Sequence, residues 1–157
     1  MIKKKILLIL IVFGLSSCGY TPMLSQNNNF NFNIENLELL GDKTINNILE
    51  KKIKQYSNNS SNKKYKISIN SNYQKNTVAK DSTGNATDLK LIASIDVAYN
   101  LYDEAENQAG KISFLESIII KKNDNTFEQN NYERSVLNNL SQLLLNKLIF
   151  YLSKEKW

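Results

Sequence analysis

The sequence predicts an α+β domain in which two helices cover one face of a four-stranded mixed sheet, as a two-layer sandwich. Four segments show the period-two alternation of half-buried strands, and two show the apolar spacing of amphipathic helices. The segments follow one another as strand, helix, strand, strand, strand, helix. A sheet with one apolar face and two helices with apolar stripes bury these surfaces most simply as two layers, with both helices on the same face. We expect a single domain over residues 30–157.

The first predicted strand begins at Phe30 and contains an irregularity near Asn36. Apolar residues alternate with polar ones along it: Phe30, Phe32, Ile34, Leu37 and Leu39. Gly41 ends the strand, and Asp42 is predicted to cap a helix over residues 43–57. The apolar stripe of this helix consists of Ile45, Ile48, Leu49, Ile53 and Tyr56. If the strands on either side of the helix are parallel, the helix forms a right-handed crossover between them.

Three further strands are predicted after a polar loop at residues 57–63. The first covers residues 65–73, and the polar segment 74–87 that follows it is expected to be the exposed tip of a hairpin. The next, residues 89–102, has a long apolar face at its odd-numbered positions. The last, residues 110–122, has apolar residues at even positions and Glu116 as an outward or edge interruption. The last two should pair as antiparallel neighbours across an acidic turn.

The final segment, residues 131–157, is the most strongly patterned helix. One apolar stripe contains Leu137, Leu140, Leu144, Leu148 and Tyr151, and a second set widens it: Leu143, Leu145, Ile149 and Leu152. A helix lying in a membrane surface is the alternative to packing on the sheet. We favour packing on the sheet, because the polar side of this helix is rich in asparagine rather than lysine.

Residues 1–17 have the features of a bacterial export signal. Three lysines at positions 3–5 precede an apolar segment of about ten residues and the small residues Ser16 and Ser17. The apolar segment is shorter than the roughly 20 residues that a spanning helix needs. We therefore predict a signal peptide rather than a membrane span.

The sequence Leu15-Ser16-Ser17-Cys18 resembles the lipobox of bacterial lipoproteins. The alternative is an ordinary secreted protein with an incidental cysteine, but Cys18 is the only cysteine and lies directly after the apolar segment. The resemblance implies cleavage before Cys18 and acylation of its thiol and new amino group. One buried acyl chain holds a protein reversibly, whereas two or three hold it stably. Residues 18–29 are then a lipidated tether, and Gly19 after the cysteine is compatible with sorting to the outer membrane.

The composition argues against most other classes of function. The formal charge is +5, but three of the 20 basic residues are the signal lysines, which leaves 17 basic against 15 acidic residues. A nucleic-acid-binding protein usually has a strongly basic face, so we expect no nucleic-acid partner. Histidine is absent, and the acids in the turn Asp103, Glu104 and Glu106 are typical of a solvated loop. We expect a binding protein rather than an enzyme, without cofactor or metal.

A lipoprotein that begins Cys-Gly-aromatic and continues with this order of elements resembles the lipopolysaccharide-assembly lipoprotein family, LptE. Two segments carry the resemblance. "CGYTPML" at residues 18–24 is similar to the opening of alphaproteobacterial members. "NNYERSVLNNLSQLLLNKLIFYL" at residues 130–152 is similar to the closing segment of the family, with its tyrosine, arginine and long apolar helix.

The resemblance implies an outer-membrane lipoprotein that sits inside the barrel of its partner LptD, as a plug and assembly factor for insertion of lipopolysaccharide. It also implies that basic residues contact lipopolysaccharide, whose phosphates and acidic sugars favour lysine and arginine. The candidates are Lys75, Lys80, Lys90, Lys121 and Lys122. The alternative for each is an ordinary solvated lysine. For the whole chain, the alternative is a structural scaffold lipoprotein of another envelope complex, for barrel assembly or secretion.

Overall fold

The computed structural model describes residues 31–103 and 107–154. The signal peptide, Cys18 and the tether of residues 18–29 lie outside the described residues. The elements are β1 (Asn33–Gly41), α2 (Lys43–Ile53), the 3₁₀ turn η1 (Lys54–Tyr56), β2 (Lys64–Lys80), β3 (Ala86–Tyr102), β4 (Asn107–Lys121) and α3 (Thr126–Lys154). The predicted order of strands and helices is confirmed.

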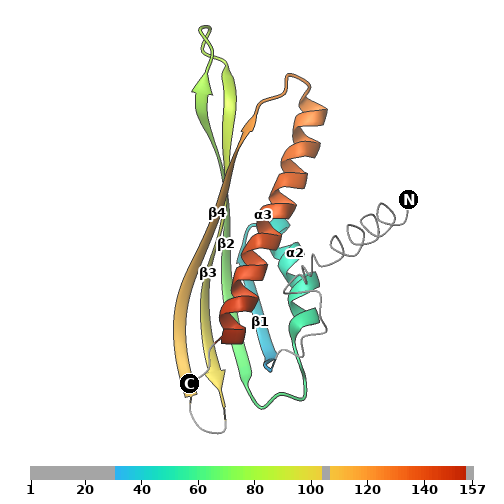
Figure 1. Cartoon of the computed structure of the whole chain (residues 1–157), viewed down its shortest axis with the longest axis vertical. Helices are drawn as coiled ribbons and strands as arrows, with labels where there is room; N and C mark the ends of the chain where they lie inside the picture. The colour runs from blue at the N-terminus through green and yellow to red at the C-terminus, as the bar shows by residue number, and fades with distance from the viewer. Residues whose placement is uncertain (1–30, 104–106, 155–157) are drawn as a thin grey trace, which may run out of the picture.

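The four strands form one mixed sheet in the order β1-β2-β3-β4, and both helices lie on the same face of it (Figure 1). β1 is parallel to β2, whereas β2, β3 and β4 are antiparallel neighbours. The pairing of β1 with β2 shifts between Ile34 and Asn36. This bulge confirms the predicted irregularity, and it explains why the apolar positions of this strand change from even to odd numbers.

The core lies between the helices and the sheet. Tyr65 and Leu91 from the sheet and Leu144 from α3 are among its fully buried side chains. Asp42 caps α2 as predicted, since its carboxylate accepts hydrogen bonds from the backbone amides of Thr44 and Ile45, both at 2.9 Å. The opposite face of the sheet, here called the open face, is covered by neither helix.

The hairpin of β2 and β3 differs from the prediction. Residues 74–80 continue β2, and β3 already begins at Ala86, so the turn is limited to residues 81–85. The backbone pairing of the two strands continues past the end of the helical layer, with irregularities between Thr77 and Lys80. Neither face of the hairpin is covered there, so its polar side chains lack the alternation that identifies a strand in a sequence.

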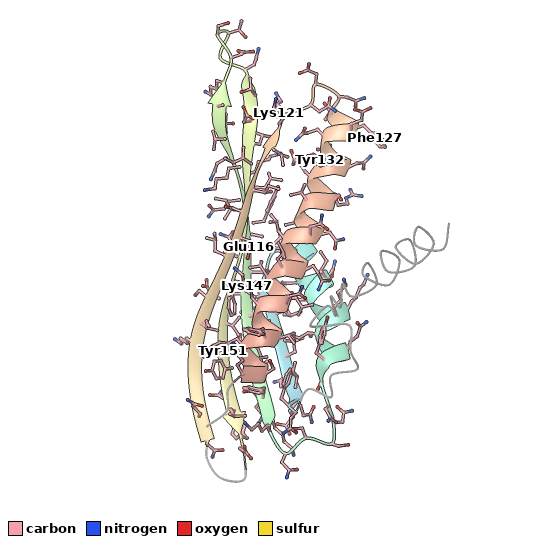
Figure 2. All side chains as sticks on the ribbon, viewed as in Figure 1. Glu116, Lys121, Phe127, Tyr132, Lys147 and Tyr151 are labelled. Atoms are coloured by element: carbon pink, nitrogen blue, oxygen red, sulfur yellow. The ribbon has the colours of Figure 1, made fainter. Side chains whose placement is uncertain are left out.

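Two side chains near α3 lie differently from the prediction. Leu143 is 48% exposed, although it was expected to widen the buried stripe. Glu116 lies on an edge strand, as one predicted alternative had it, but it does not point outward, because it occupies an even position of β4 and forms an ion pair with Lys147 of α3 (Figure 2). α3 itself starts five residues earlier than predicted, where the Asn125 side chain accepts hydrogen bonds from the amides of Phe127 and Glu128. None of the helices in residues 31–103 and 107–154 is both long and apolar enough to cross a membrane.

Candidate functional site

The turn between β2 and β3 lies at the far end of the sheet from the start of β1. Asn33 pairs with Lys64, and β2 then runs for 17 residues to Lys80. At ~3.3 Å per residue, the turn lies about 55 Å along the sheet from the start of β1. Figure 1 shows the hairpin projecting past the first turn of α3. A tether attached before β1 and a contact at the hairpin tip would therefore act at opposite ends of the domain.

Asp81 organises the hairpin tip. Its carboxylate accepts hydrogen bonds from the Thr83 hydroxyl at 2.7 Å, the Thr83 amide at 2.8 Å and the Asn85 amide at 2.9 Å. These bonds, led by the one from the Thr83 side chain, hold the pKa of Asp81 below its usual value. The ionised carboxylate thus stabilises a tip of defined shape.

The strand register brings two of the five candidate lysines together on the open face. Lys90 lies opposite Ile119, and Lys121 lies opposite Asp88. Lys90 and Lys121 are therefore diagonal neighbours, at the ~7–8 Å spacing typical of such pairs. Neighbouring residues of a strand point to opposite faces of the sheet. Leu89 and Ile120 are buried on the helical side, so the side chains of Lys90 and Lys121 point to the open face.

Lys122 follows the end of β4, where its backbone amide donates to the carbonyl of Thr87 at 2.8 Å. Lys121 and Lys122 also line an open hollow of about 680 Å³ beside the tip, together with Asp81, Asp88 and Asp124. The hollow therefore mixes two amines with three carboxylates. Asp88 borders the open-face lysines as well, because it lies directly opposite Lys121 and two positions before Lys90.

Lys75 and Lys80 are separate from that group. Lys75 reaches α3 and forms an ion pair with Glu133 at 2.9 Å. Glu133 also contributes to raising the pKa of Tyr73, for which burial is the larger cause. Lys80 is exposed at the last position of β2, next to the tip. The structure thus places Lys80 where a contact at the tip would reach it, and assigns Lys75 an intramolecular partner.

Apolar side chains lie beside Lys90 on the open face, and the sequence analysis did not single them out. Ile92 lies opposite Ser117, between Leu115 and Ile119 of β4. Leu115 is 60% exposed and Ile119 is 59% exposed. We call the set of Lys90, Ile92, Leu115, Ile119 and Lys121 the amphipathic patch. These residues occupy even positions of β3 and odd positions of β4, whereas the core residues occupy the other positions of each strand. This alternation is the sequence signal that places them on a common face.

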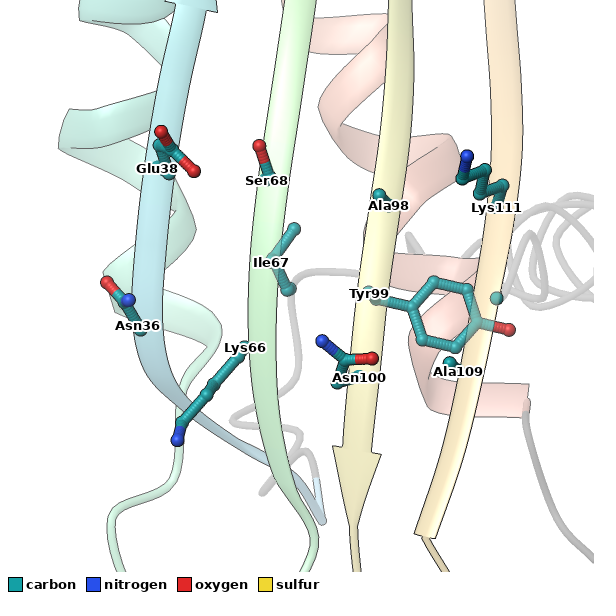
Figure 3. A pocket seen from close by; sticks show the side chains of 11 residues that line it. Asn36, Glu38, Lys66, Ile67, Ser68, Ala98, Tyr99, Asn100, Ala109 and Lys111 are labelled. Carbon is teal, nitrogen blue, oxygen red and sulfur yellow. The ribbon is translucent and has the colours of Figure 1, made fainter.

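A second feature of the open face is a shallow hollow of about 600 Å³ near the start of β2 (Figure 3). Its lining includes the small residues Ser68 and Ala98 and the charged residues Glu38, Lys66 and Lys111. Lys66 lies 3.6 Å from the Glu35 carboxylate and 5.0 Å from the centre of the Tyr102 ring. These groups suit hydrogen bonding to a polar surface. Within the described part of the chain, no group of three or more acidic, histidine or cysteine side chains is placed to hold a metal ion.

The fold is similar to that of two lipoproteins of known structure. Rare lipoprotein B from Shewanella oneidensis gives a TM-score of 0.55 at 12% identity, over 75% of this chain and 93% of the other. An uncharacterized lipoprotein B from Nitrosomonas europaea gives a TM-score of 0.52 at 15% identity, over 78% of this chain and 84% of the other. At these identities the similarity shows a common fold. No protein-family model and no curated protein matches the chain.

Proposed function

We propose that this chain is an LptE-like lipoprotein of the outer membrane, which partners an LptD-type barrel as plug and assembly factor in the insertion of lipopolysaccharide. The observation that carries the proposal is the combination of a lipobox-like segment ending at Cys18 with the fold of rare lipoprotein B, a protein also called LptE. Either feature alone is common to many proteins. Their occurrence in one chain of this size favours this role.

The geometry supports a plug anchored at one end. The lipid on Cys18 would hold the start of the domain near the membrane leaflet, and the projecting hairpin would enter the barrel lumen. Its side chains are mostly amides, hydroxyls and lysines, which are able to hydrogen bond to the polar inner wall of a barrel. The hydrogen bonds of Asp81 keep the tip ordered before it meets a partner.

The amphipathic patch is the part of the surface best suited to lipopolysaccharide. Lys90 and Lys121 would pair with phosphates or acidic sugars, and Ile92, Leu115 and Ile119 offer apolar contact to acyl chains. Lys80 would add a charge at the tip. Lys75 contributes least to this proposal, because Glu133 already neutralises it.

Site-specific photocrosslinking in cells tests the barrel partner. Probes at Thr77, Lys80 and Asn85 are expected to capture a large outer-membrane barrel. A probe at Asn47, exposed on α2, is the matched control and should capture it less often. If none of the three hairpin positions gives a barrel adduct, the plug arrangement is wrong.

Metabolic labelling with radioactive fatty acid tests the anchor. The native chain should incorporate the label, and Cys18→Ala should not, because the thioether forms on that thiol. Equal labelling of both chains would reject the lipoprotein assignment. Co-purification with a barrel-assembly or secretion complex, in place of an LptD-type barrel, would favour the scaffold alternative.

A further inference from the structure

β4 forms an outer edge of the sheet that has neither a bulge nor a proline to block it. It pairs with β3 over all 15 of its residues without a register shift, and it contains no proline. β1, at the opposite edge, has nine residues and a bulge. Long, regular edge strands are templates for a further strand, and proteins commonly block them with bulges, prolines or charges. Within residues 31–103 and 107–154, no strand pairs with the outer side of β4.

The hydrogen-bonding pattern between β3 and β4 identifies the backbone groups of β4 that point to the free edge of the sheet. The Lys122 amide bonds to the carbonyl of Thr87, the residue that continues the β3–β4 register. In an antiparallel pair, hydrogen-bonded positions alternate with positions that face away. Even-numbered residues of β4 therefore bond to β3, and odd-numbered residues direct their amides and carbonyls to the edge. These are Asn107, Ala109, Lys111, Ser113, Leu115, Ser117, Ile119 and Lys121, and all eight are exposed.

The middle of this edge is apolar and carries no free charge. Leu115 and Ile119 are 60% and 59% exposed, and Ile118 is 43% exposed. Glu116 is the only charged residue between Lys111 and Lys121. It points toward α3, where Lys147 neutralises it (Figure 2). The edge therefore lacks an outward charge at its centre that would repel an added strand.

We propose that β4 binds an extended segment of a partner protein as a fifth strand, antiparallel to β4. The two lysines that flank the apolar middle of the edge define the chemistry of that segment, since acidic residues ten positions apart would lie opposite Lys111 and Lys121. Apolar residues two and six positions after the first acid would lie opposite Ile119 and Leu115. The site gains its affinity from backbone hydrogen bonds and its specificity from these alternate side chains. This proposal does not depend on the proposed function.

A second copy of this chain fits the edge less well than an acidic partner. Antiparallel pairing of two β4 strands around their centres places the lysine-bearing ends of one strand against those of the other. Like charges at directly opposed or diagonal positions are destabilising. Charge complementarity therefore favours a segment with acidic ends over self-association.

Binding of a synthetic peptide to the full chain in detergent tests the proposal. The fluorescent probe has roughly eleven residues, with glutamate at both ends, valine at the third and seventh positions and threonine elsewhere. We expect saturable binding by fluorescence anisotropy. Methylating the backbone nitrogens that face β4 should weaken binding at least about tenfold, because each lost hydrogen bond contributes ~0.5–1.5 kcal/mol. Replacing both glutamates by lysines should also weaken it.

The matched protein variants are Ser117→Pro and Ser117→Ala. The Ser117 amide points outward, so proline there removes a donor from the edge without removing a bond to β3. Ser117→Pro should lose at least about tenfold in affinity while keeping the circular dichroism spectrum, and Ser117→Ala should bind normally. Equal binding by a folded Ser117→Pro chain, or no binding of the glutamate peptide to the native chain, would overturn the proposal. A concentration-dependent dimer abolished by Ser117→Pro would also overturn it, in favour of a second copy.

Discussion

Gly41 connects β1 to α2 at a point where any other residue would collide with the neighbouring strand. Its φ is +92°, and a Cβ atom built on it would lie 1.9 Å from the Ser71 carbonyl oxygen. That same oxygen accepts a hydrogen bond from the Asp42 amide at 3.0 Å. From the residue type at Gly41, the sequence predicted that the first strand ends there. It could not predict the close approach to Ser71, which depends on the parallel register of β1 and β2.

Gly41→Ala should destabilise the domain more than Gly84→Ala. Gly84 has a similar φ of +89°, but no atom lies within 4 Å of its Cβ position. Alanine at Gly84 should cost the conformational penalty alone, ~1–2 kcal/mol. At Gly41 the collision with the Ser71 backbone should add ~1–3 kcal/mol. Urea unfolding of the two variants measures the difference, and equal losses would show that the backbone at Gly41 relaxes freely.

At the scale of elements, α3 has one side in the core, and the structure shows which of its apolar residues lie outside that buried side. Leu144 is fully buried, whereas its neighbour Leu143 is 48% exposed. Leu144→Ala should cost ~2–5 kcal/mol in the free energy of unfolding, because it leaves a cavity against the sheet. Leu143→Ala, the same chemical change at the exposed margin, should cost less than about 0.5 kcal/mol. A small loss for Leu144→Ala would contradict core packing and favour the membrane-surface alternative.

Elements with a covered face were predictable, and those without one were not. The apolar alternation of β3 and the stripe of α2 reflect burial, so they appear in the sequence as clear periods. The polar part of β2 after Tyr73 is held by pairing with β3 alone, and backbone pairing leaves no such period. The direction of the Glu116 side chain could not be predicted for a related reason. Its partner Lys147 is on α3, and the crossing of that helix over β4 is not encoded locally.

At the scale of the whole molecule, the candidate lysines separate into groups that sequence spacing does not indicate. The pairing of Asp88 with Lys121 brings Lys90 and Lys121 together across two strands. The sequence supplied the residue type for binding an anion, but the register decides which lysines share a surface. The register also left Lys75 on the side of the sheet that faces α3, where Glu133 engages it.

Reversing the charge of Lys80 and Lys90 together tests whether the tip and the amphipathic patch bind glycolipid. The double variant to glutamate should weaken binding of purified lipopolysaccharide roughly tenfold, since each reversal loses an attraction of up to ~1 kcal/mol and adds a repulsion. The fold should persist, because Lys80 is exposed and Lys90 lies on the uncovered face. The matched control reverses Lys51 and Lys54, which are exposed at the end of α2 and change the net charge equally. An equal loss in the control would indicate a general charge effect. Unchanged binding in the test variant would remove Lys80 and Lys90 from the site without rejecting the proposed function.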